Sequence, residues 1–565
     1  MDNQRLILFI ALSVVIMLLF NAWQEQFAPT PQLATPIAGM PTDQPLPPGS
    51  DSIPLPPGVA ANDVPTTQPQ GSAAPATVPA ARPGDSAAID SRQRITVITD
   101  LLKVEIDTLG GDIRRASLLK YPLKLKDPND PVVLFNDQFP KVMIAQSGLL
   151  ANVGANVDHH VIFSADKTQY QLSETSDNVS VVLKWKNEEG FAVSKTYTFH
   201  RNNYVIDMAV EVQNGTTQDW SGRLYRQLQR SDATSEDQSA FIYTYTGGVV
   251  SYENNKYEKV DFDDMATWRP EASYVKAGWI AMIQHYFLGA WIPVQDQYNY
   301  YYTKALDNGR YMIGMSTAES KIAAGQSGQF SSKLFIGPKE QNRLAAAAPN
   351  LQLTVDYGVL TILADPVFWL LKWIYHYVQN WGWAIIFVTL IIKLIFYKLS
   401  EAAYRSMATM RKFQPKIQAL RERYGSDRQR MSQAMMEIYK KEKINPLGGC
   451  LPMLVQIPVF IALYWVLLES VELRQAPFIL WINDLSSKDP YYVLPLLMGV
   501  SMFIQQKLNP APMDPMQQKI LSFLPIVFTL FFAFFPSGLV LYWVANNVLS
   551  IIQQWYITRK IEQAD

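Results

Sequence analysis

The chain reads FAVSKTYTFHRNNYVIDMAVEV at residues 191–212. Apolar and polar side chains alternate on both sides of His200-Arg201-Asn202-Asn203, the two-residue period of half-buried strands joined by a turn. Similar alternation marks residues 95–98, 102–106 and 179–185, and Gly, Asn and Asp turns separate the runs. We therefore predict an antiparallel β-sandwich over residues 92–345.

Four of the five histidines lie in this predicted sandwich, namely His159, His160, His200 and His285. None has the sequence spacing of a metal site. A sugar-processing sandwich could use a scattered histidine with a carboxylate, but turn or surface positions explain these residues better. The acidic run at 261–264 lacks the Gly-punctuated loop of a calcium site. The sequence thus predicts no metal site, no cofactor and no catalytic residue.

Composition limits the possible functions. With 565 residues the chain exceeds one compact core, which predicts several domains. A formal net charge of -1 argues against a dedicated DNA-binding protein. The single cysteine, Cys450, excludes an intramolecular disulfide framework and a cysteine-based zinc site.

The first 91 residues divide into two segments. Residues 6–20 read LILFIALSVVIMLLF, and with the residues up to Phe27 they can cross roughly 30 Å of hydrocarbon. Since no A-x-A-like cleavage site follows, an uncleaved anchor over residues 1–27 is favoured over a signal peptide. Residues 28–91 are rich in Pro and Ala and predict an extended tether without chemistry.

The last third is apolar and predicts an all-α membrane bundle over residues 373–565, preceded by an interfacial helix region at 346–372. Candidate spans are residues 373–396, 447–470, 491–507, 518–535 and 537–556, which with the anchor make six crossings. Between residues 398 and 443 basic residues outnumber acidic ones by twelve to five, which predicts the cytoplasmic side. Both termini would then be cytoplasmic and the sandwich would lie on the outer side of the membrane.

The same basic loop, 398–443, carries apolar residues at helical spacing on both sides of Gly425-Ser426-Asp427. We expect a cytoplasmic helical hairpin. Two helices that pack only against each other would explain this pattern. Alternatively, the methionines of the hairpin could contact apolar polypeptide, and its basic face could bind RNA or anionic lipid. The candidate contact residues are Met407, Met410, Arg411, Lys412, Arg421, Arg423, Met431 and Met435.

Polar residues interrupt the candidate spans. Lys393 stands within Ile391-Ile392-Lys393-Leu394-Ile395, and a charge at the centre of a span costs about 2.5–3.5 kcal/mol. It should therefore snorkel to the interface or face a cavity. Thr389, Gln456, Asn546 and Asn547 add polar groups, and Pro458 and Pro525 weaken their helices. Together they favour a shared hydrophilic cavity. Two of the candidate spans also carry apolar residues that offer an apolar flank beside these polar groups, namely Leu454, Ile457, Phe528 and Phe531.

Several motifs carry a resemblance to a known family. They are NPLGGC at 445–450, QIP at 456–458, VELRQAP at 471–477, DPMQQ at 514–518 and FPSGL at 535–539. They closely resemble those of the YidC/Oxa/Alb family of membrane protein insertases in its Gram-negative bacterial form. The resemblance implies a protein that is not an enzyme, whose positively charged groove, open to cytoplasm and lipid, lets a nascent segment slide into the bilayer.

The resemblance also implies roles for individual residues. Lys393 stands where the family usually has an arginine, Thr389 and Tyr542 match sliding and bundle-stabilising positions, and Gln456 and Asn547 match polar groove positions. The implied partners are nascent membrane proteins, the lipid bilayer, the Sec translocon and, through the cytoplasmic loops, the ribosome or signal-recognition machinery. The nine residues after Tyr556 are shorter than the long basic tails of ribosome-binding members.

Two other functions fit parts of the pattern. A small-solute transporter or channel could use Lys393 as its binding charge, although the chain has no internal repeat and no second buried charge to couple with it. A membrane-anchored sugar enzyme would need a convergent carboxylate or histidine site, which the sequence does not display.

Overall fold

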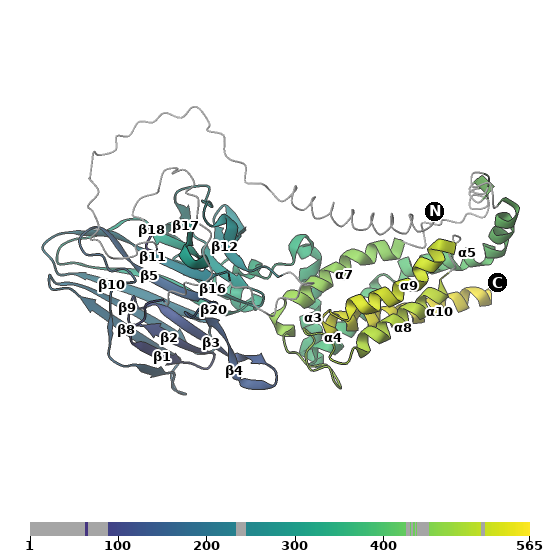
Figure 1. The fold of residues 1–565 in the computed structure, drawn as a ribbon, viewed down its shortest axis with the longest axis horizontal. Helices are drawn as coiled ribbons and strands as arrows, with labels where there is room; N and C mark the ends of the chain where they lie inside the picture. The colour runs from purple at the N-terminus through teal and green to yellow at the C-terminus, as the bar shows by residue number, and fades with distance from the viewer. Residues whose placement is uncertain are drawn as a thin grey trace, which may run out of the picture. The chain divides into compact units, whose positions relative to one another are not determined.

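The computed structural model describes residues 63–65, 89–232, 244–424, 430, 433–434, 437, 451–509 and 515–564. The expected N-terminal anchor and most of the expected tether lie outside these residues. The described chain contains two β-sheets followed by a set of helices (Figure 1).

The strands form sheets of eleven and nine strands. The larger has the order β14 (Val275–Lys276), β17 (Tyr298–Leu306), β18 (Arg310–Thr317), β11 (Trp220–Ser231), β5 (Met143–Val153), β3 (Ile113–Lys124), β2 (Leu102–Asp107), β1 (Arg94–Ile98) and β7 (Gln169–Gln171), with β19 (Ser320–Ile322) beside β11 and β4 (Asp127–Phe135) beside β3. The smaller has the order β13 (Asn255–Val260), β12 (Gly247–Tyr252), β15 (Trp279–Gln284), β16 (Phe287–Pro293), β20 (Ser327–Pro338), β10 (Val205–Asn214), β9 (Phe191–His200), β8 (Asn178–Lys186) and β6 (Ser164–Ala165).

The hairpin expected at 191–212 is confirmed. Strands β9 and β10 pair antiparallel with Phe199 opposite Ile206, and β9 alternates buried and half-buried residues along its whole length. Asn202 provides the turn with a φ of 52°, a left-handed conformation that asparagine tolerates better than most residues. The sandwich is antiparallel except where β1 pairs parallel with β7.

The two sheets bury one core. Trp220, Trp279 and Trp291 are fully buried in it. The core also contains a charged residue, Arg226 on β11, which donates hydrogen bonds to Ser332 Oγ of β20 and Asn299 Oδ1, both at 2.7 Å. Because side chains alternate along a strand, its neighbours Tyr225 and Gln227 point to the opposite face of the larger sheet.

The helices are α2 (Gln341–Ala347), α3 (Thr361–Val378), α4 (Trp381–Ile395), α5 (Tyr397–Tyr424), α7 (Leu451–Glu469), α8 (Val493–Leu508), α9 (Pro515–Phe532) and α10 (Ser537–Ala564). The expected span at 373–396 is wrong in its first part, because Trp373 belongs to α3. That helix ends at Gln379, whose φ is 51°. Asn380 then caps α4, its side chain accepting a hydrogen bond from the Trp383 N–H at 3.1 Å.

Helix length and composition bear on the expected six crossings. Within the described residues, no single helix is both long and apolar enough for a membrane span, whereas the pair Trp381–Ile395 and Tyr397–Ala408, bent by 68°, meets that criterion together. Shorter apolar helices cover Gln456–Glu469, Val493–Leu508 and Lys519–Phe532.

A buried ion pair joins the end of the sandwich to the end of α7. Lys339, which follows β20, places its Nζ 2.9 Å from Glu469 Oε2, and the two side chains are only 3% and 6% exposed. Lys339 Nζ also donates to Thr354 O at 3.2 Å. Nearby, His285 Nε2 donates to Leu468 O at 2.9 Å. These contacts fix α7 to the sandwich.

Glu472 makes the stability of this junction pH-dependent. It lies in a 3-10 turn (Val471–Leu473) after α7, 4.0 Å from Lys372 Nζ, and burial raises its pKa to about 7 from an ordinary 4.5. The folded protein therefore holds a proton that the unfolded chain releases, so this group contributes less stability as the pH rises from 4.5 to 7.

We expect the substitution Glu472→Gln to remove this dependence. As the pH rises from 4.5 to 7, the free energy of unfolding of the variant should increase relative to that of the parent by on the order of 2–3 kcal/mol. Denaturant titrations in detergent at pH 4.5, 6 and 8 measure the difference. The exposed Glu174→Gln serves as the control. If the difference in unfolding free energy between the parent and Glu472→Gln stayed constant with pH, the expectation would be contradicted.

Candidate functional site in the helical region

Three helices bring polar side chains together around Lys393. Lys393 lies in the last turn of α4, and its Nζ donates hydrogen bonds to Ser550 Oγ on α10 at 2.7 Å and to Gln456 Oε1 on α7 at 3.3 Å. Gln456 Nε2 in turn donates to Asn546 Oδ1 on α10. We refer to Lys393, Gln456, Asn546 and Ser550 as the Lys393 cluster.

The positions on α10 explain how one helix supplies two members. Asn546 and Ser550 are four residues apart and so share a helix face. Ser550 Oγ also donates to the Asn546 carbonyl at 2.7 Å, which holds the hydroxyl beside the lysine. The cluster is thus a connected hydrogen-bond network across α4, α7 and α10.

The charge of Lys393 is not neutralised locally. No Asp or Glu oxygen lies within 4.0 Å of its Nζ in the parts of the chain that the structure describes, and both of its hydrogen-bond acceptors are neutral. The carbonyl end of α4 favours a cation in the last turn. The cluster therefore presents a net positive charge.

Three other expected site residues lie near the cluster, and two of them, Thr389 and Asn547, bond elsewhere. Thr389, one turn before Lys393, is buried and donates to Ile385 O at 2.7 Å. Tyr542 is buried, its side chain interacts with that of Gln456 in the cluster, and its ring lies 5.8 Å from that of Phe460. Asn547 joins α10 to α8, since its Nδ2 donates to Ser501 Oγ at 3.0 Å.

The expected apolar flank is partly described. Ile457 and Phe531 are exposed, and Phe528 is half-buried with its ring 6.4 Å from that of Trp543. The side chain of Leu454 lies outside the described residues. Exposed apolar side chains on α7 and α9 are therefore available to contact lipid or another apolar chain.

Of the hairpin residues, the structure describes few side chains. Helix α5 includes Met407, which is half-buried, and Arg423, which is exposed. The side chains of Met410, Arg411, Lys412 and Arg421, and the whole of Met431 and Met435, lie outside the described residues. The expected break at 425–427 also lies outside them.

Ser550 is a site residue that the sequence interpretation missed. A serine in an apolar helix is unremarkable by itself, but its position four residues after Asn546 would have placed it on the face of the polar pair.

Comparison with known proteins covers the whole chain. The family described as the YidC periplasmic domain matches residues 94–370, and the one described as the 60Kd inner membrane protein matches residues 373–564. The membrane protein insertase YidC of Nitrosococcus oceani is 52% identical, with 100% of each chain covered. The chain belongs to the YidC family of membrane protein insertases.

Two further similarities describe this YidC-family chain. The membrane protein insertase YidC of Methylococcus capsulatus is 51% identical, with 100% of this chain and 99% of that protein covered. A crystal structure of an active YidC insertase with its first transmembrane domain resolved covers 83% of this chain and 93% of its own, at 18% identity and a TM-score of 0.37.

The family settles the coarse function and location. This YidC-family chain is a membrane protein insertase of the inner membrane, with a periplasmic β-sandwich domain. The resemblance inferred from the motifs is confirmed, and the transporter and sugar-enzyme alternatives are set aside.

Proposed function

We propose that the Lys393 cluster lines a positively charged hydrophilic groove, open to the cytoplasm and to lipid, through which this insertase transfers nascent inner-membrane proteins. The observation that carries the proposal is the Lys393 ammonium, whose acceptors among the described residues of α4, α7 and α10 are neutral. An uncompensated charge in an apolar helical region marks a functional site more often than a structural one.

The mechanism needs no covalent chemistry. Lys393 attracts an acidic, hydrated segment of the substrate, and water held by Gln456, Asn546 and Ser550 shortens the apolar distance that this segment must cross. The hydrophobic helix of the substrate meanwhile contacts the exposed Ile457 and Phe531 as it leaves for lipid. Transfer of that helix into the bilayer supplies the driving free energy.

We infer six crossings with both termini in the cytoplasm, because the basic loop at 398–443 marks the cytoplasmic side. The proposed hairpin in that loop receives substrates from the ribosome or the signal-recognition machinery. The insertase acts alone or with the Sec translocon, and it also assists the folding of the inserted proteins.

Site-specific photocrosslinking tests the proposed path. A photoreactive amino acid at Ile457 or Phe531 should capture the hydrophobic helix of a short, stalled membrane protein. The matched control is Leu496, which is equally apolar and exposed but lies on α8, outside the proposed substrate path along α7 and α9. Equal capture at Leu496 and at the two test positions would contradict the path.

A further inference from the structure

A second constellation of polar groups lies in the sandwich, away from the Lys393 cluster. Asp63 belongs to a short described segment, residues 63–65, and Gln227 Nε2 of β11 donates to its backbone carbonyl at 2.9 Å. Its carboxylate faces two adjacent histidines between β5 and β6. Asp63 Oδ2 lies 3.2 Å from His159 Nε2, and Oδ1 lies 3.5 Å from His160 Nε2.

Each imidazole is held by a second partner through its other nitrogen. His159 Nδ1 lies 2.5 Å from the Tyr225 hydroxyl, and His160 Nδ1 lies 3.4 Å from Asp158 Oδ1. Metal binding requires the tautomer with the proton on Nδ1, in which each ring donates to its partner and the lone pair of Nε2 is directed toward Asp63. Metal-binding histidines are commonly oriented by such outer hydrogen bonds.

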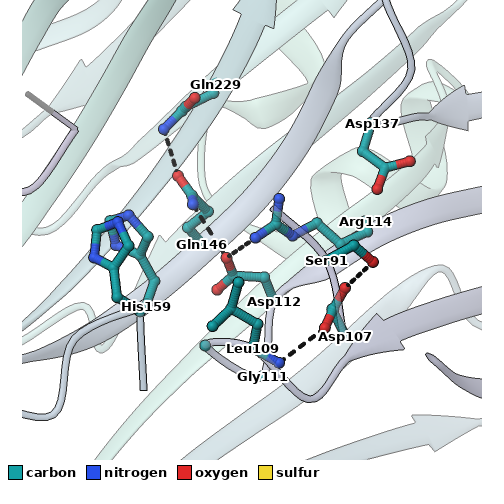
Figure 2. A network of polar contacts seen from close by, with 12 residues as sticks. Ser91, Asp107, Leu109, Gly111, Asp112, Arg114, Asp137, Gln146, His159 and Gln229 are labelled. Atoms are coloured by element: carbon teal, nitrogen blue, oxygen red, sulfur yellow. Dashed lines mark hydrogen bonds and ion pairs between the residues drawn. The ribbon is translucent and has the colours of Figure 1, made fainter. Parts of the chain in front are cut away.

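The inner atoms of this constellation lack hydrogen bonds. His159 is 2% exposed, and its Nε2 and Asp63 Oδ1 are buried without a hydrogen-bond partner among the described residues. Figure 2 shows His159 beside a buried network in which Gln146 links Gln229 to Asp112. A buried polar atom without a partner calls for an explanation, and a bound water or ion is one.

We propose that Asp63, His159 and His160 bind a divalent transition-metal ion, with Zn²⁺ the best fit. A tetrahedral zinc ion with bonds of about 2.0–2.1 Å separates neighbouring donors by about 3.3 Å. The nitrogen–oxygen distances in the structure, 3.2 Å from His159 to Oδ2 and 3.5 Å from His160 to Oδ1, lie close to that value. All three donor atoms lie within 4.8 Å of one another. Water completes the coordination.

The donor set and the local charge define the selectivity. Two imidazoles with one carboxylate suit zinc, nickel or cobalt, whereas magnesium and calcium prefer oxygen ligands. Asp63 supplies a carboxylate oxygen as the third protein ligand. Lys304 and Arg310 also lie near Asp63 and oppose a dication, so the affinity should be moderate.

The site would link two distant parts of the chain. Asp63 precedes the first strand of the sandwich, while His159 and His160 follow β5. A bound metal ion would fasten the segment around Asp63 to the outer face of the larger sheet, the face on which Tyr225 and Gln227 lie. The proposed role is therefore structural, and it is independent of the Lys393 cluster.

Metal binding by the full-length protein in detergent tests the proposal. After treatment with EDTA and buffer exchange, the protein is titrated with ZnCl₂ by calorimetry, and bound zinc is measured by mass spectrometry after dialysis. We expect one zinc ion per chain. Asp63→Asn and His160→Gln should each weaken zinc binding at least tenfold. The matched control is His200→Gln, since His200 pairs with Asp207 at 2.7 Å in a half-buried position outside the proposed site.

Hydrogen exchange provides a second readout. Zinc should slow amide exchange at Val64 in the parent and in His200→Gln, but not in Asp63→Asn, and circular dichroism confirms that each variant is folded. The proposal is overturned if the parent binds no zinc, or if zinc binds equally well to Asp63→Asn and His160→Gln.

Discussion

Replacing Lys393 with alanine is expected to slow membrane insertion about tenfold, because the substitution removes the positive charge of the Lys393 cluster. A unit charge attracting a substrate carboxylate at an intermediate effective dielectric constant supplies about 1–2 kcal/mol, which corresponds to roughly that factor in rate. Lys393→Arg should retain most of the activity, since it keeps the charge. Protease-protected insertion of a small Sec-independent membrane protein into liposomes measures the effect.

The matched control for this experiment is Lys398→Ala. Lys398 lies five residues further along the chain, in α5, is fully solvent-exposed and forms an ion pair with Glu401 at 3.3 Å. The Lys398→Ala variant should insert substrate at the parental rate. If Lys393→Ala matched both the parent and Lys398→Ala, Lys393 would be a residue that snorkels to the interface, and the insertase would work without its charge.

The second large effect concerns the junction between the sandwich and α7. Lys339→Met leaves the carboxylate of Glu469 buried without its cation, and breaking a buried ion pair in this way costs about 3–5 kcal/mol. We expect a correspondingly lower midpoint of denaturant unfolding, measured in detergent. The double substitution Lys339→Met/Glu469→Leu should recover much of the loss, because neither charge is then left buried alone.

An exposed ion pair provides the comparison. Lys184 and Asp166 lie 3.6 Å apart with side chains 57% and 72% exposed, so Lys184→Met should change the free energy of unfolding by less than about 1 kcal/mol. Equal destabilisation by Lys184→Met and Lys339→Met would show that the buried junction has no special importance.

The sequence predicted the sandwich well because one physical rule governs it. Strands β9 and β10 bury alternate side chains, and that alternation is visible in residues 191–212. The division between α3 and α4 was harder to predict. The aromatic residues around Trp373 suggested the start of a span, whereas the local signal was Gln379-Asn380, a helix end followed by an N-cap. Hydrophobicity alone did not reveal it.

The polar cluster was predicted in part. Lys393, Gln456 and Asn546 are conspicuous because amides and charges are rare in apolar helices, and the structure joins them. Asn547 is equally conspicuous but faces Ser501 on α8, since adjacent residues on a helix point in different directions. The sequence alone could not decide which of the two asparagines belongs to the cluster.

The histidines show a different limit. We expected turn or surface positions, and His159 does lie in a turn, but its side chain is buried beside Tyr225 rather than exposed. Its acidic neighbour Asp63 comes from a Pro- and Ala-rich segment that gave no sign of chemistry. No rule of local spacing connects residues so far apart in the chain, because only the fold brings them together.

The central claim is that the charge of Lys393 guides the substrate. Reversing the sign of the charge at residue 393 and in the substrate tests it most directly. Parent and Lys393→Glu proteins are reconstituted in liposomes and given two versions of one small membrane protein, with either aspartate or lysine in its translocated segment. The account predicts that the parent favours the acidic version and that Lys393→Glu reverses this preference. The same preference in both proteins would contradict the proposal that the charge of Lys393 guides the substrate.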